Sequence, residues 1–68
     1  MIIVEKCSVN PANQEAKIEA FADTKSEVYE GATFVGLPQG CTIAMGSSVM
    51  TASGELAFMK SDGTWNWV

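Results

Sequence analysis

Two cysteines and two adjacent serines are the side chains of this 68-residue chain best suited to nucleophilic chemistry. Such a nucleophile needs a neighbouring base, most often histidine, and the chain contains no histidine. Ser47 and Ser48 follow Gly46 without the Gly-x-Ser-x-Gly pattern of a nucleophile elbow. The residues therefore predict no catalytic site, and we expect a protein that is not an enzyme.

Acidic residues offer two further arrangements with chemical potential. Asp23 with Glu27, and Glu15 with Glu19, could form carboxylate pairs, but a glycosidase cleft needs a larger protein around it. These acids fit a surface charge pattern better. The Gly-x-x-x-Gly segment at 36–40 lacks the Gly-Lys-Ser/Thr ending of a phosphate-binding loop.

Cys7 and Cys41 are too few for a structural zinc site, which takes four ligands, and they form no Cys-x-x-Cys pair. We expect no metal and no cofactor. In a reducing cytoplasm both cysteines should be free, and free cysteines are usually buried. A single bridge between them is the alternative that the sequence leaves open.

The composition is that of one small globular domain spanning residues 1–68, with 47% hydrophobic and 18% charged residues. A net charge of −4 without arginine argues against nucleic acid as a partner. No secretory signal and no transmembrane segment is predicted, so we expect no membrane partner and synthesis in a cytoplasm.

The N-terminal third predicts a β-hairpin. Residues 2–9 are rich in β-branched side chains, and Asn10-Pro11-Ala12-Asn13 is a turn signal. Residues 15–21 then alternate between charged and apolar positions, which indicates a second strand. A helix over residues 12–22 is the competing interpretation, because alanine, glutamate and lysine favour helices.

A short helix is predicted over residues 25–30. Thr24 and Glu27 have the spacing of a capping box, and Gly31 suits the position after a helix C-terminus. Residues 31–54 carry no charge, and their glycines and Pro38 indicate a loop. A short strand over residues 42–45 would follow.

The C-terminal third predicts a three-stranded antiparallel meander over residues 48–52, 55–60 and 64–68. Ser53-Gly54 and Asp62-Gly63 suit two-residue hairpin loops, and loops of that length fix the register. In that register one face has Val49 opposite Phe58, Phe58 opposite Trp67, and Lys60 opposite Trp65. The other face has Met50 opposite Ala57 and Met59 beside Asn66. The predicted class is α+β, mostly β.

Both faces of this predicted meander are apolar, whereas a sheet with one solvated face should alternate apolar and polar residues. The hairpin and helix can cover one face only, so we expect a subunit interface in a homo-oligomer. A thin sandwich with both faces covered by the rest of the chain is the alternative. The proposed interface residues are Met50, Phe58, Met59, Trp65 and Trp67.

Residues 36–68 carry a resemblance. Their pattern runs through Gly36-Leu37-Pro38-x-Gly40, Met45-Gly46-Ser47-Ser48, Ser53-Gly54-Glu55 and Ser61-Asp62-Gly63-Thr64-Trp65. It resembles short proteins encoded among the structural genes of bacteriophages and prophages of Gram-positive bacteria. The resemblance implies a virion-associated or virion-assembly protein, a small β-rich oligomer that contacts other virion proteins. It implies no catalytic residues.

Two functions from different classes follow. The first is a non-enzymatic structural or assembly subunit that self-associates and docks on a larger particle, with the virion as its destination. The second is a small monomeric binding module or host-takeover inhibitor that contacts one host protein through its acidic N-terminal part.

Overall fold

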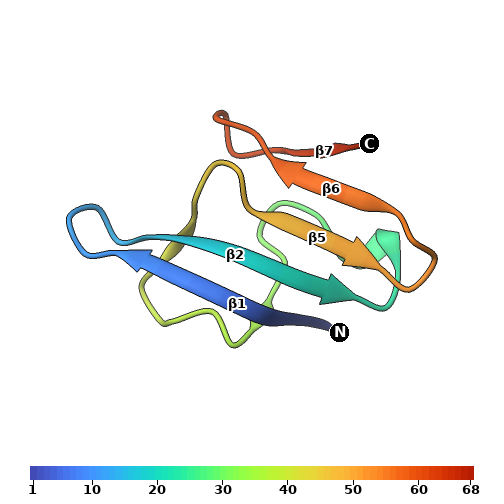
Figure 1. Ribbon diagram of the computed structural model, residues 1–68, viewed down its shortest axis with the longest axis horizontal. Helices are drawn as coiled ribbons and strands as arrows, with labels where there is room; N and C mark the ends of the chain where they lie inside the picture. The colour runs from blue at the N-terminus through green and yellow to red at the C-terminus, as the bar shows by residue number, and fades with distance from the viewer.

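The computed structural model describes residues 1–68 and is almost entirely β-structure (Figure 1). This confirms the expected mostly β character. Seven strands form one sheet in the order β3-β1-β2-β5-β6-β7, with β4 also paired to β2. The strands are β1 (Ile2–Asn10), β2 (Glu15–Ala22), β3 (Phe34–Val35), β4 (Thr42–Ile43), β5 (Ser48–Thr51), β6 (Leu56–Met59) and β7 (Trp65–Trp67).

Strands β1 and β2 pair antiparallel across the turn at residues 11–14. Burial alternates along β2: Ala16, Ile18 and Ala20 are buried, and the residues between them are exposed. This period of two is that of a strand with one buried face, so β2 is a strand and the competing helix over residues 12–22 is absent.

The hairpin and the C-terminal strands belong to one sheet, because β2 pairs parallel with β5. The sequence predicts the hairpin as a separate layer over the meander, which is wrong. The two antiparallel parts lie side by side, joined along a parallel seam that β4 extends toward the start of β2 (Figure 1). Parallel partners need a long crossover connection, here residues 23–47, and so leave no local sequence signal.

The predicted helix over residues 25–30 is wrong, since only a 3₁₀ turn forms at Lys25–Glu27. The expected capping-box pair of Thr24 and Glu27 does flank this turn. The Glu27 carboxylate accepts hydrogen bonds from the backbone amides of Asp23 and Thr24, at 3.1 and 3.2 Å. Val28 then adopts an extended conformation and is buried. A β-branched residue favours this conformation, which ends the turn.

The meander of β5, β6 and β7 has a register one residue away from the predicted one. Both hairpin loops contain three residues rather than two. The Thr51 amide donates to the Glu55 carbonyl, and the Lys60 amide donates to the Thr64 carbonyl. The third residue of each loop is a left-handed glycine, at φ 86° and 85°. A type I turn followed by such a glycine is the usual three-residue hairpin loop.

This difference reverses the faces of β6 relative to β5 and β7, because side chains alternate along a strand and the two shifts cancel at β7. Val49 lies opposite Ala57, and Ala57 opposite Trp67, on one face. Met59 lies opposite Trp65 on the same face. Phe58 lies opposite Ser48 and Asn66 on the other face, so the predicted pairs Val49–Phe58, Phe58–Trp67, Met50–Ala57 and Lys60–Trp65 do not form.

Residues 23–43, which we call the covering segment, cross one face of the sheet; we call this the covered face and its opposite the open face (Figure 1). Phe34 of this segment stacks on Trp65, with ring centroids 5.9 Å apart. The Lys25 ammonium lies 4.9 Å from the Trp67 ring centroid, so lysine and tryptophan do meet, although the predicted pair was Lys60 and Trp65. The core contains Ile2, Ala16, Ile18, Ala20, Ala22, Val28, Phe34 and Val49.

Candidate functional site: the open face of the sheet

An unbroken line of apolar residues crosses the open face at one level of the sheet. Paired positions place Val35 beside Ile3, Ile3 beside Phe21, and Phe21 beside Met50. Met50 lies opposite Leu56, and the Val68 amide donates to the Leu56 carbonyl at 2.9 Å. We call this line the apolar row: Val35, Ile3, Phe21, Met50, Leu56 and Val68.

The apolar row is open to solvent along most of its length. Val35, Ile3 and Met50 are 48%, 46% and 49% exposed, and Phe21 is 36% exposed. Single exposed apolar residues are normal on a monomer, but a contiguous line across a sheet marks an interaction surface. Apart from Val35, which belongs to the line, the covering segment packs on the opposite face through Val28 and Phe34.

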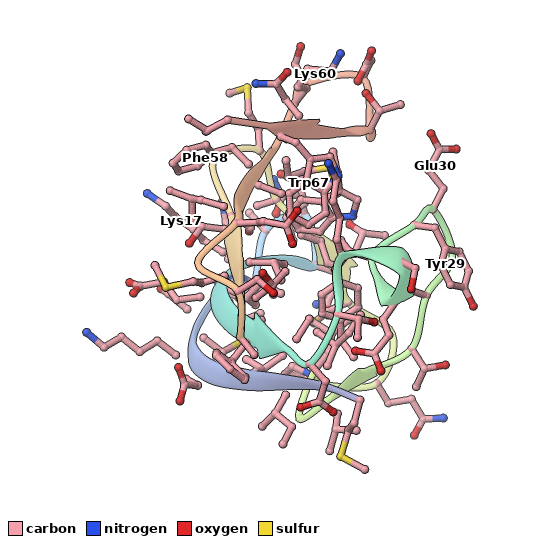
Figure 2. All side chains as sticks on the ribbon, turned by 90° about the vertical axis from the view of Figure 1, so that its right-hand side faces the viewer. Lys17, Tyr29, Glu30, Phe58, Lys60 and Trp67 are labelled. Carbon is pink, nitrogen blue, oxygen red and sulfur yellow. The ribbon has the colours of Figure 1, made fainter.

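A second level of the open face mixes charge with one aromatic ring. Its paired positions run from Lys6 through Glu19, Ser48 and Phe58 to Asn66. Phe58 is 40% exposed. Figure 2 shows Phe58 and Lys17 on one side of the sheet, with Trp67, Tyr29 and Glu30 on the other.

A hollow of about 500 Å³ lies over the middle of the β1–β2 hairpin, and its lining residue Ser48 is paired with Phe58. Its walls include the side chains of Lys6, Lys17, Glu19 and Ser48, together with Gly46. The open face therefore has a ring on β6 and a polar hollow over β1 and β2.

Charge on the hairpin part of the open face is balanced, in contrast with the whole chain. The outward positions of the hairpin carry Lys6, Lys17, Glu15 and Glu19, which cancel. The acid excess lies elsewhere, including on the covering segment. Close approach of another molecule to the open face is therefore not opposed by the net charge of −4.

Carboxylates with shifted pKa values lie at the ends of the molecule, away from this face. Hydrogen bonds from the Met1 amino group and the Thr24 amide lower the pKa of Glu27. The contacts of the Met1 amino group with Glu27 and Asp23 raise the pKa of that amine. In the β6–β7 loop, the Thr64 hydroxyl and amide lower the pKa of Asp62. The Met1 amino group, Asp23 and Asp62 are exposed, and Glu27 is half-buried.

The five residues proposed from the sequence as an interface do not share one surface. Met50 and Phe58 are exposed on the open face. Met59 is buried, and Trp65 and Trp67 are half-buried on the covered face. The predicted register already placed these residues on both faces; the three-residue loops reverse β6, so that Phe58 joins Met50 and Met59 joins Trp65 and Trp67.

Sequence reasoning left four exposed members of the apolar row out of the proposed interface: Ile3, Phe21, Val35 and Val68. The alternation of residues 15–21 held a usable signal, because it places Phe21 on the same side as Glu19. The contribution of Val35 depends on its parallel pairing with β1, for which the sequence offers no indication.

The remaining reactive groups are dispersed. Cys41 is half-buried, and Cys7 is exposed on the outer strand β1, contrary to the burial expected for it. No three cysteine or acidic side chains lie together in a position to hold a metal ion. A second hollow of about 390 Å³, on the covered side, is lined partly by Tyr29, Phe34 and Trp65.

Comparisons with protein families, with curated proteins and with solved structures found no match to this chain. The molecule contains no helix with the length and apolar character needed to cross a membrane. The geometry of the open face therefore has to carry the functional inference.

Proposed function

We propose that this protein is a non-enzymatic structural subunit that acts by self-association and by docking on a larger particle. The observation that carries this is the solvent-exposed apolar row across the open face. Burial of apolar surface contributes about 25 cal/mol per Å² before the costs of association are deducted. A surface of this kind favours contact with another protein surface over retention in water.

We place the protein among virion-associated or virion-assembly proteins of bacteriophages and prophages. This part rests on the resemblance of residues 36–68 to short proteins encoded among phage structural genes. A flat apolar face supports such a role, because particles are built from repeated contacts between copies of few chains. In this proposal the hairpin and the meander form one continuous contact surface, because both belong to the same sheet.

The oligomeric state tests the function. We expect size-exclusion chromatography with light scattering to give a multiple of the 7.2 kDa chain mass, decreasing on dilution. A monomer of 7.2 kDa at every concentration would contradict self-association and favour the monomeric binding module instead.

A further inference from the structure

We infer that a second copy of this chain covers the open face. A two-fold axis relates the two copies; it lies above the open face, runs parallel to the strands and passes over the seam between β2 and β5. This inference rests on the proposed function and specifies its contact surface. Sheets that pack face to face keep their strand directions within about 30° of each other, which this arrangement satisfies.

Such an axis places the apolar row against itself. It exchanges the two sides of the seam at a constant level along the strands, so Phe21 of each copy lies over Met50 of the other. By the same operation Ile3 meets Leu56, and Val35 meets Val68. All six positions of the row then have apolar partners, as an isologous interface requires.

The same axis brings Phe58 to the hollow of the second copy. Phe58 on β6 and Lys6 on β1 lie at the same level, at equal distances on opposite sides of the seam. The Phe58 ring of each copy therefore enters the hollow bounded by Lys6 and Lys17 of the other. An ammonium over an aromatic face is a favourable contact. The two-fold axis thus carries the position of the Phe58 ring onto the position of the hollow, on the same surface.

Size and charge fit a second copy. The molecule measures 35 × 22 Å across the plane of Figure 1, an outline comparable with the roughly 800 Å² that each partner buries in a standard interface. The two lysines and two glutamates of the hairpin cancel on the open face, so the hairpin parts of two identical faces can approach without the repulsion expected between two chains of charge −4.

The sign of the charge introduced at position 58 tests this geometry. Phe58→Lys places an ammonium against Lys6 and Lys17 of the other copy, whereas Phe58→Glu places a carboxylate there. We expect the dimer Kd of Phe58→Lys to exceed that of Phe58→Glu by at least about tenfold, measured by sedimentation at several concentrations. Tyr29→Lys is the matched control, since Tyr29 is 60% exposed on the covered side and should leave the Kd unchanged.

A charge exchange within one chain supplies the second measurement. Lys6 and Phe58 are three strand spacings apart in a single copy, roughly 14 Å, so they contact each other only across the interface. The double variant Lys6→Glu with Phe58→Lys should therefore bind more tightly than Phe58→Lys alone, with a dimer Kd lower by at least about tenfold. Amide NMR spectra verify that each variant is folded.

The outcomes separate this inference from the proposed function. An oligomer whose Kd is the same for Phe58→Lys and Phe58→Glu, or is not recovered by the charge exchange, would overturn the two-fold open-face contact while self-association stands. If Phe58→Lys fails to fold, Ile3→Lys in the apolar row must weaken the dimer relative to Tyr29→Lys, and equal Kd values overturn the inference. A wild-type monomer overturns both.

Discussion

At the scale of single residues, the buried Ser47 hydroxyl joins two strands that lie on the same edge of β2. β4 and β5 both pair with β2, and the Ala44 amide still donates to the Ala16 carbonyl at 2.8 Å, but residues 45–47 form no backbone pair with β2. The Ser47 Oγ accepts a hydrogen bond from the Ile18 amide at 2.9 Å and donates to the Ala16 carbonyl at 3.4 Å. A side chain thus satisfies backbone groups that a continuous strand would have paired.

We predict that Ser47→Ala destabilises the protein by about 1–3 kcal/mol, because the buried Ile18 amide loses its acceptor. Urea unfolding followed by tryptophan fluorescence measures this loss. Ser53→Ala, in the exposed β5–β6 loop, is the control and should change stability by less than about 0.5 kcal/mol. Equal effects of the two substitutions would show that the hydroxyl has no role in the seam.

Asp62 stabilises the β6–β7 loop through Thr64. Its carboxylate accepts from the Thr64 hydroxyl at 2.6 Å and from the Thr64 amide at 3.0 Å, and both contacts lower its pKa. A carboxyl with a lowered pKa in the folded state contributes stability above its unfolded pKa. That contribution is lost as the pH falls through the folded pKa.

We therefore expect carboxyl-carbon NMR titration to place the pKa of Asp62 below the ordinary aspartate value of about 3.9. Thr64→Val should raise the Asp62 pKa toward that value, since the hydroxyl donor is lost. Thr64→Ser keeps both donors and should preserve the low pKa. A Thr64→Val titration identical to wild type would contradict the assigned cause.

At the scale of the elements, loop length decides which side chains reach the open face. The apolar runs, the turn positions and the β1–β2 hairpin follow from local sequence, and the burial pattern of β2 was visible as alternation. The choice between a two-residue and a three-residue loop depends on glycine geometry that the Ser-Gly and Asp-Gly pairs do not reveal. That single ambiguity placed Phe58 and Met59 of β6 on the wrong faces.

The left-handed glycine at the end of the β6–β7 loop offers a test of this assignment. Gly63 has φ 85°, and a Cβ at this position would have no atom within 4 Å, so a substitution meets backbone strain alone. We predict that Gly63→Ala costs about 1–2 kcal/mol in urea unfolding, and that Gly63→Asn costs less because asparagine tolerates this conformation. An alanine variant as stable as the asparagine variant would argue against the left-handed loop.

At the scale of the whole molecule, we expect the two faces to divide stability from association. The covered face holds the core, and the open face holds the exposed apolar row. Neither the seam nor the side on which the covering segment packs could be predicted, because both depend on contacts between residues distant in sequence. The sequence showed that both faces of the meander are rich in apolar residues. Which of these residues lies on which face depends on the register, which the sequence did not determine.

We predict that substitutions on the two faces have separable effects. Ile18→Ala, at a side chain only 1% exposed on the covered face, should lower the free energy of unfolding by about 2–5 kcal/mol. It should leave the dimer Kd unchanged at temperatures where the variant is folded. Phe58→Lys should instead abolish the rise of the melting temperature with protein concentration that an associating protein shows.

Calorimetry at two concentrations measures both quantities for each variant. A melting temperature that is independent of concentration in the wild type, or a Kd that changes in Ile18→Ala as much as in Phe58→Lys, would contradict the separation of roles.

The parallel seam also sets an order of events during folding. The hairpin and the meander each close through short loops, but Ile18 and Ser47, which meet at the seam, are 29 residues apart in the chain. To bring these two residues together, the chain between them must lose conformational entropy before the contacts at the seam form and compensate for that loss. The two antiparallel parts can therefore form early and independently, and the search that joins them limits the folding rate. Until it ends, both sides of each part are exposed, and the nascent chain is at its most prone to aggregate.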